Sequence, residues 1–251
     1  MSHFTDTHVH LADPQLASQL NAVLQQAEAA GVHRFIVPSA EQSDWPAVAA
    51  LNAPNIRPAF GIHPWFADTA DKQSFTQLAD WLAEYPHALV GETGLDYLRS
   101  RDETERERQR QTFSGHIRLA AEFGRPLILH HVGAAQDTVR LLKEAKFRYG
   151  GFAHAFSGSL EEARAFTRLG FKIGIGSLLL NPNAKKIRRA AAELPPQDIV
   201  LETDSPFMLK NAVNTPENIR KIAEITAALH GITLKELAGQ TEQNVTAVLA
   251  F

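Results

Sequence analysis

The chain has 251 residues, of which 44% are hydrophobic, so it can bury a large core and has the usual length of an α/β barrel. Its 28 acidic and 25 basic residues nearly balance, and no overall positive charge therefore indicates nucleic acid or an anionic membrane as partner. Cysteine is absent, which excludes disulfides, thiolate metal sites and thiol nucleophiles.

Short apolar runs alternate with amphipathic segments along the whole chain. Most of the runs are rich in Val, Ile, Leu and Phe and are too short for helices, as expected for parallel strands that are buried on both faces. The predicted strands are Phe4–His8, Arg34–Pro38, Arg57–Ile62, Leu89–Glu92, Pro126–His130, Gly151–His154, Phe171–Gly176 and Ile199–Thr203.

Helical patterns lie between these runs. Gln15–Ala30 ends before Gly31, Thr104–Phe123 ends before Gly124, and Ala155–Leu169 contains a helical run that ends before Gly170. The first half of the Thr104–Phe123 pattern has Glu and Arg three and four residues apart, which predicts a solvated face with ion pairs rather than a nucleic-acid surface. Thr233–Phe251 predicts an extra helix that packs against the rest of the fold.

Eight strands that alternate with helices imply right-handed βαβ units and a parallel sheet. Eight repeats in this length fit a closed (β/α)₈ barrel better than an open doubly wound sheet. An open sheet would also need a phosphate-binding glycine motif after its first strand, where Asp6-Thr-His-Val-His10 stands instead. No linker divides the chain, so we predict a single barrel domain over residues 1–251 with an extra C-terminal helix.

The sequence contains no feature that predicts a membrane location. No apolar run approaches the roughly 18 residues of a membrane span. The N-terminal residues have neither the charged nor the apolar region of a signal peptide. We therefore expect a cytoplasmic protein with no membrane partner and no obligate protein partner.

Metal-binding side chains recur where the predicted strands end. Because barrel active sites lie at the C-terminal ends of the strands, we expect these side chains to share one site. The segments that carry them are Asp6–His10, Glu92–Asp96, His130, His154 and Glu202–Asp204.

The first two segments offer imidazoles and a carboxylate. Side chains alternate along a strand, so Asp6, His8 and His10 share a face if the chain stays extended. A carboxylate such as Glu92 after an apolar run is costly unless it is paired or binds a cation, and a buried salt bridge is the alternative. The residues after Glu92 predict a sharp turn that places Asp96 either to cap or to reach back into the site.

In the later segments, the sequence does not decide which residue binds the metal. His130 and His131 are adjacent and point to opposite faces, and spacing does not choose between them. His154 has a core histidine as its alternative. Glu202 and Asp204 share a face, so one could bind metal while the other orients a ligand histidine, and an Asp beside metal-bound water could accept its proton.

The other histidines have weaker links to this site. His63 ends the third strand and could contact substrate, or it could form a structural turn before Pro64. The remaining histidines are expected to be surface or packing residues: His3, His33, His87, His116 and His230.

The candidate ligands are too many for one four-coordinate cation. A two-metal site bridged by Glu92 is therefore the natural hypothesis. Ligation rich in histidine suits Zn, Mn, Co or Ni, whereas Mg prefers oxygen ligands and water. The candidate metal ligands are His8, His10, Glu92, His130, His154 and Asp204.

These segments closely resemble the TatD-related family of metal-dependent hydrolases, within the amidohydrolase-like superfamily. The resemblance covers essentially the whole chain, because the motifs keep their order from residue 6 to residue 206 and Thr241-Glu-Gln-Asn-Val245 also matches. The matching motifs are Asp6-Thr-His-Val-His10, Gly61-Ile-His-Pro64, Gly91-Glu-Thr-Gly-Leu-Asp96, Pro126-Leu-Ile-Leu-His130, His154-Ala-Phe-Ser-Gly-Ser159 and Leu201-Glu-Thr-Asp-Ser-Pro206.

The resemblance implies a distorted (β/α)₈ barrel with two divalent metals. It favours His130 over His131. Family members that are characterised as enzymes are metal-dependent deoxyribonucleases, which implies DNA or another phosphodiester as the substrate. The implied ligand sets are His8, His10, Glu92 and Asp204 for one metal, and Glu92, His130 and His154 for the other.

The chain departs from the family where phosphate is bound. An Arg often follows the fifth-strand histidine, but His131-Val132-Gly133 stands here. The loop after the eighth strand, residues 208–216, has Lys210 as its only cation. Arg99, Lys185 and Lys186 are the possible substitutes, and of these we take Arg99, with His63, as substrate-binding.

We therefore predict a metal-dependent phosphodiesterase in which Asp204 accepts a proton from a metal-activated water and Glu92 bridges the metals. One alternative is a hydrolase of the same superfamily that acts on a lactone, an amide or a non-nucleic-acid ester. Such enzymes often bridge their metals with a carboxylated Lys, and no predicted strand ends in Lys. A further alternative is a non-catalytic metal-binding scaffold.

Overall fold

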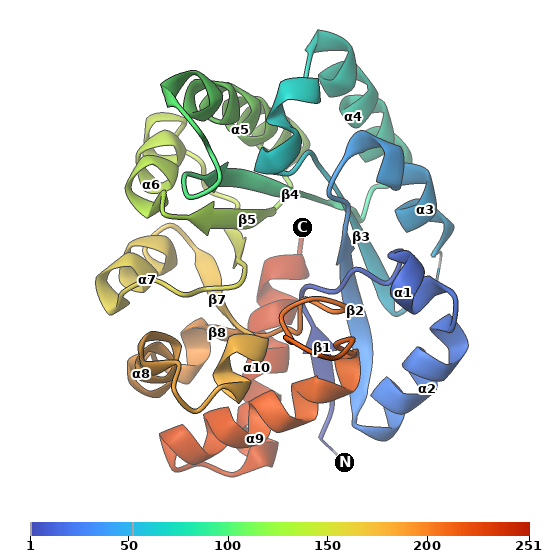
Figure 1. Ribbon diagram of the computed structural model, residues 1–251, viewed down its shortest axis with the longest axis vertical. Coiled ribbons are helices and arrows are strands. Elements are labelled where there is room, and N and C mark those ends of the chain that lie inside the picture. Colours follow the sequence, from blue (N-terminus) through green and yellow to red (C-terminus); the bar gives the residue numbers. More distant parts are fainter. Residues whose placement is uncertain (1, 52) are drawn as a thin grey trace.

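The computed structural model describes residues 2–51 and 53–251. Eight parallel strands follow one another around the sheet in sequence order, and helices lie outside them (Figure 1). The strands are β1 (Phe4–Asp6), β2 (Val32–Pro38), β3 (Ile56–Phe60), β4 (Leu89–Asp96), β5 (Leu127–Val132), β6 (Gly151–Ala153), β7 (Phe171–Ile175) and β8 (Ile199–Leu201).

The helices follow the strands in the order that the alternation predicts. The α-helices are α1 (Pro14–Ala17), α2 (Leu20–Ala29), α3 (Trp45–Ala50), α4 (Lys72–Glu84), α5 (Glu103–Phe123), α6 (Ala135–Glu144), α7 (Leu160–Thr167), α8 (Lys185–Glu193), α9 (Ile219–His230) and α10 (Leu234–Leu249). Short 3₁₀ helices are η1 (Gln42–Asp44), η2 (Pro64–Thr69), η3 (Ser177–Leu180), η4 (Pro196–Asp198) and η5 (Pro216–Asn218).

The sheet closes between its first and last strands. The Thr7 N–H donates to the Leu201 carbonyl at 3.0 Å, and the Asp204 N–H donates to the His8 carbonyl at 2.9 Å. Most of this seam is formed by residues that follow β1 and β8, which are only three residues long each, so the barrel is distorted there. The predicted (β/α)₈ barrel is therefore confirmed.

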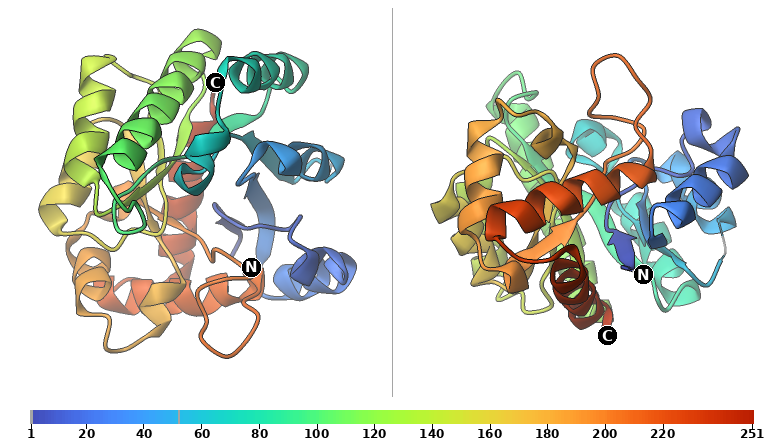
Figure 2. Two further views of the ribbon diagram at one scale, coloured as in Figure 1. Left: turned by 45° about the horizontal axis from the view of Figure 1, so that its top comes forward. Right: turned by 90° about the horizontal axis from the view of Figure 1, so that it is seen from below.

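Helix α10 covers the amino-terminal end of the barrel. Its Val245, Val248 and Leu249 pack on the apolar residues at that end of the strands, among them Ile128 and Phe152. In the right-hand view of Figure 2, α10 and the loop after β8 lie at opposite ends of the molecule. The predicted extra helix is confirmed, and the carboxyl ends of the strands are left for a site.

Strand β4 differs from the prediction. A turn was expected after Glu92, but β4 continues to Asp96 and remains paired with β5. Gly94 permits this, because its φ is +135° and a Cβ at this position would lie 2.0 Å from the His130 carbonyl oxygen. The pairing register shifts between Val90 and Thr93, so the irregularity of this strand lies around Glu92 and not in the residues after it, where the turn was predicted.

The observed helices lie where they were predicted, but some of them differ in length from the prediction. The predicted helix over Gln15–Ala30 is broken into α1 and α2. Within Ala155–Leu169, the helix begins only at Leu160, after a capping box formed by Ser159 and Glu162. Helix α5 ends at Gly124 as predicted, and its charged face carries ion pairs from Arg110 to Glu103 and Glu107. Among the described residues, no helix is long and apolar enough to cross a membrane.

One buried histidine links α5 to the chain just before His63. His116 is fully buried, and its Nε2 accepts the Ile62 N–H at 3.0 Å. Its Nδ1 lies 2.8 Å from the Thr112 carbonyl and donates to it. The contact in which Nε2 accepts requires a neutral ring, and burial lowers the pKa of His116 to about 4.

This histidine makes stability depend on pH. The unfolded chain takes up a proton at His116 below about pH 6.5, whereas the folded protein does so only below about pH 4. The stability that depends on neutral His116 is therefore present above pH 6.5 and is lost as the pH falls toward 4. His116→Gln should reduce the slope of unfolding free energy against pH in this window by up to about 1.4 kcal/mol per pH unit. Urea titrations at several pH values measure the slope, and equal slopes in both proteins would contradict the prediction.

Candidate metal centre

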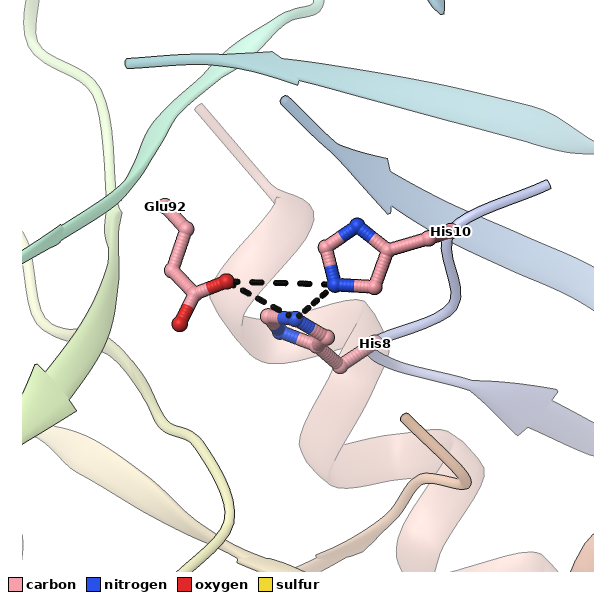
Figure 3. Close-up of side chains that lie close together, drawn as sticks. All are labelled: His8, His10 and Glu92. Atoms are coloured by element: carbon pink, nitrogen blue, oxygen red, sulfur yellow. Dashed lines mark hydrogen bonds and ion pairs between the residues drawn. The ribbon is translucent and has the colours of Figure 1, made fainter. Parts of the chain in front are cut away.

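The segment after β1 and strand β4 bring two imidazoles and a carboxylate together (Figure 3). His8 Nε2 lies 3.2 Å from both His10 Nε2 and Glu92 Oε2, and His10 Nε2 lies 3.9 Å from the same oxygen. Ligand atoms around a tetrahedral zinc ion, with bonds of about 2.0–2.1 Å, are separated by roughly 3.3 Å. The spacing of these three atoms thus fits a bound cation.

A second group forms around the other oxygen of the same carboxylate. Glu92 Oε1 lies 3.0 Å from His130 Nδ1 and 3.4 Å from His63 Nε2. The two ring nitrogens are 3.1 Å apart. This group comes from β4, β5 and the segment between β3 and η2, and its spacing also fits a cation.

The third group lies on the β6 and β8 side of the site. It contains His8, His154 and Asp204. His154 Nε2 lies 3.7 Å from Asp204 Oδ2 and 3.9 Å from Glu92 Oε1. Asp204 Oδ1 faces the first group, at 3.4 Å from His10 Nε2 and 3.8 Å from His8 Nε2.

The carboxylates of this site remain ionised in spite of their burial. Burial alone would raise the pKa of Glu92, but the imidazoles of His63, His8 and His154 hold it well below its usual value. Burial likewise opposes ionisation of Asp204, whose pKa is lowered by His154 and His10. Ionised carboxylates beside imidazoles are the ligand set that Zn²⁺ and similar divalent metals bind.

Two further carboxylates lie behind the histidines. Asp96 Oδ2 lies 3.1 Å from His130 Nε2, and Glu202 Oε1 lies 3.1 Å from His154 Nδ1. Burial would raise the pKa of Asp96, but hydrogen bonds from His130 and Trp65 lower it to about 2. Burial would lower the pKa of His154, but Glu202, Asp204 and Glu92 raise it to about 10. A carboxylate behind an imidazole holds the ring in place for metal binding.

The backbone around Asp204 is held in an unusual conformation. Asp204 has a φ of +59°, in the left-handed region that non-glycine residues seldom adopt. The preceding Thr203 is anchored by Asp6, whose Oδ1 accepts its N–H at 2.9 Å and whose Oδ2 accepts its hydroxyl at 2.6 Å. Buried Asn214 donates to the Thr203 carbonyl at 2.8 Å. Asp6 therefore supports the site from behind rather than facing it with His8.

The six predicted ligands all converge, and His63 lies among them. His131 does not, since it faces away and packs against Phe156 and Phe166. Arg99 does not contact the cluster directly. Its guanidinium lies 3.8 Å from the centre of the Trp65 ring, and Trp65 contacts Asp96. Lys185, Lys186 and Lys210 are exposed on the loop after β8 and at the start of α8.

Trp65 also belongs to the surroundings of the site and was not predicted from the sequence. Its indole N–H donates to Asp96 Oδ2 at 2.8 Å, and its ring centre lies 4.7 Å from that of His63. An exposed Trp two residues after a strand-end histidine was the available signal, because it stands in the loop region where barrels carry their sites.

The chain matches a known protein family over almost its whole length. The family model of TatD related DNases matches residues 5–250. The chain is 35% identical to YjjV of Escherichia coli K12, named as an uncharacterized metal-dependent hydrolase, over 94% of this chain and 93% of YjjV. It is 29% identical to the human deoxyribonuclease TATDN3, over 95% of this chain and 92% of that protein.

Solved structures show the same relationship. The crystal structure of YjjV, a TatD homologue, superposes with a TM-score of 0.92 and 32% identity over 99% of this chain and 98% of that one. A TatD family hydrolase from Entamoeba histolytica has a TM-score of 0.84 at 21% identity, covering 98% of both chains, and shares the fold. This chain belongs to the TatD-related DNase family and is a metal-dependent hydrolase.

Proposed function

We propose that the chain is a phosphodiesterase of the deoxyribonuclease type that uses two divalent cations bridged by Glu92. One observation carries this proposal: the two oxygens of a single buried carboxylate face different sets of imidazoles. Oε2 lies beside His8 and His10, whereas Oε1 lies beside His63 and His130. A carboxylate in this position is suited to bridge two metals.

In this proposal each cation has its own ligands in addition to Glu92. His8, His10 and Asp204 would hold one, and His130 and His154 would hold the other. The donor set favours Zn, Mn, Co or Ni, while Mg would need more oxygen ligands. When bound, the cations would lower the pKa of a water molecule and neutralise negative charge that develops on the phosphoryl group.

In this proposal, side chains of the protein accept the proton from the water molecule and bind the substrate. Asp204 is ionised, and its Oδ2 faces His154 Nε2 at 3.7 Å on the inside of the cluster, where it can accept a proton. His63 and Arg99 are the residues that we expect to contact the substrate.

A charged groove beside the cluster supports a nucleic-acid substrate. It has a volume of about 260 Å³, and its lining includes Trp65, Arg99 and Arg108, the acidic residues Asp68 and Glu105, and Arg101, which pairs with Glu105. Arginine side chains bind the phosphates of a nucleotide chain, and an exposed aromatic ring can stack with a base. The human relative is named a deoxyribonuclease, which agrees with this class of substrate.

Two other functions are tested by the same assay. A hydrolase of other esters, lactones or amides would leave bis-p-nitrophenyl phosphate and single-stranded DNA intact while cleaving its own substrate class. A metal-binding scaffold would bind metal and hydrolyse neither compound. Turnover of bis-p-nitrophenyl phosphate and DNA that requires added Zn, Mn, Co or Ni is the result we expect.

Asp204→Asn should lower kcat for bis-p-nitrophenyl phosphate by about 100-fold or more, because the amide cannot accept the proton. Asp198→Asn is the matched control, since it makes the same change at the other end of β8, in η4. Steady-state kinetics and metal analysis of both variants measure the effect. Wild-type turnover by Asp204→Asn at full metal content would contradict the proposed role.

Gly174→Ala should weaken metal binding by displacing the carboxylate behind His154. A Cβ on Gly174 would lie 2.3 Å from Glu202 Oε2, so Glu202 would have to move away. Loss of such a supporting carboxylate lowers metal affinity by about 10- to 100-fold. Gly239→Ala is the control, because a Cβ there meets nothing within 4 Å. Metal titration measures the affinities, and equal values for the two variants would contradict the role of Glu202.

A further inference from the structure

His63 has the position of a metal ligand but does not belong to either proposed ligand set. Its Nε2 lies 3.4 Å from Glu92 Oε1 and 3.1 Å from His130 Nδ1. On distance alone, His63 fits the second metal site better than His154, whose Nε2 lies 3.9 Å from Glu92 Oε1 and which groups with His8 and Asp204. The groups that face the far side of each ring distinguish the two histidines.

The far nitrogen of His63 faces a hydrogen-bond donor. His63 is the N-cap of η2, and its Nδ1 accepts the backbone N–H of Trp65 at 3.1 Å. Pro64 has no N–H, so Trp65 supplies the first donor that this cap can accept. Nδ1 must therefore keep its lone pair, and in a neutral imidazole the proton then resides on Nε2. That proton points into the site and excludes a metal bond at the same atom.

The far nitrogens of the proposed ligands face carboxylates instead. His130 Nε2 lies 3.1 Å from Asp96 Oδ2, and His154 Nδ1 lies 3.1 Å from Glu202 Oε1. A carboxylate attracts the ring proton to the outer nitrogen and leaves the inner nitrogen with a lone pair for a cation. The polarity behind His63 is thus opposite to the polarity behind His130 and His154.

We infer that His63 is a hydrogen-bond donor of the active site and not a metal ligand. Its Nε2–H donates to an anionic oxygen of the substrate that binds beside Glu92 and His130. If the substrate is a phosphodiester, this oxygen is a non-bridging phosphoryl oxygen, and only this last identification rests on the proposed function.

The donor is held rigidly. The His63 side chain is 6% exposed, and its ring packs edge-on against that of Trp65. The preceding Ile62 N–H donates to His116 Nε2 at 3.0 Å, and the His63 N–H donates to the Ala40 carbonyl at 2.7 Å. A donor fixed before the substrate arrives needs no reorganisation during the reaction, which is the condition for effective stabilisation of an oxyanion.

The protonated nitrogen can be observed directly in the wild-type protein. Long-range ¹H–¹⁵N correlation spectra of the zinc-loaded protein, assigned with His63→Gln, should show His63 with a proton on Nε2 and none on Nδ1. A proton on Nδ1 together with a metal-bound Nε2 would overturn the inference. This measurement uses no substrate, so it remains decisive if the chain does not hydrolyse phosphodiesters.

Two variants separate a donor from a ligand. His63→Leu removes the donor, and His63→Gln retains an N–H on a side chain of similar length. We expect both to bind as many metal ions per chain as the wild type, whereas the matched variant His130→Leu should bind fewer. His63→Leu should lower kcat by about 100- to 1,000-fold, as for loss of one oxyanion donor, and His63→Gln should recover part of it.

Two results would overturn the inference. One is the loss of a metal ion in His63→Leu, which would make His63 a ligand. The other is an unchanged kcat in His63→Leu under conditions in which the wild type is active, which would exclude a donor to the substrate. An inactive wild-type protein would instead count against the phosphodiesterase proposal and leave the metal count and the spectra as the tests of His63.

Discussion

The buried carboxylate of Glu92 is the group on which the rest of the site depends. Its side chain is only 5% exposed, and an isolated charge at such a position would cost several kcal/mol. The surrounding imidazoles and the cations that they could hold offset this cost. Because these imidazoles belong to segments far apart in sequence, the site exists only when the barrel has closed and brought the carboxyl ends of its strands together.

A second constraint acts on the far side of each imidazole. An imidazole has two nitrogens, and the group that faces the outer one decides whether the inner one presents a proton or a lone pair. Asp96 and Glu202 therefore prepare His130 and His154 for cations, whereas the Trp65 N–H prepares His63 to donate. Histidine side chains thus have two roles in the same site, and the group that faces the outer nitrogen of each ring determines which role it has.

Much of the fold and most of the ligands could be predicted from local patterns. Apolar runs that alternate with amphipathic segments were sufficient to predict the eight strands, because this alternation repeats along the chain. The C-terminal helix was predicted from the segment that follows the eighth repeat. The extent of β4 and the break between α1 and α2 were not predicted. The first depends on Gly94, which lets β4 pass the His130 carbonyl closely, and a close approach between two strands leaves no mark in the local pattern.

By itself, the sequence determined which chemical groups are available and at which ends of the strands they stand. It determined the ligand types, the absence of thiols and the presence of a carboxylate after an apolar run at Glu92. Only the tertiary structure decided which nitrogen of each histidine faces the site, that His131 turns away among phenylalanines, and that Asp6 supports Thr203 instead of joining the cluster. The physical reason is that protonation and orientation depend on hydrogen-bond partners from distant segments, which meet only when the barrel is closed.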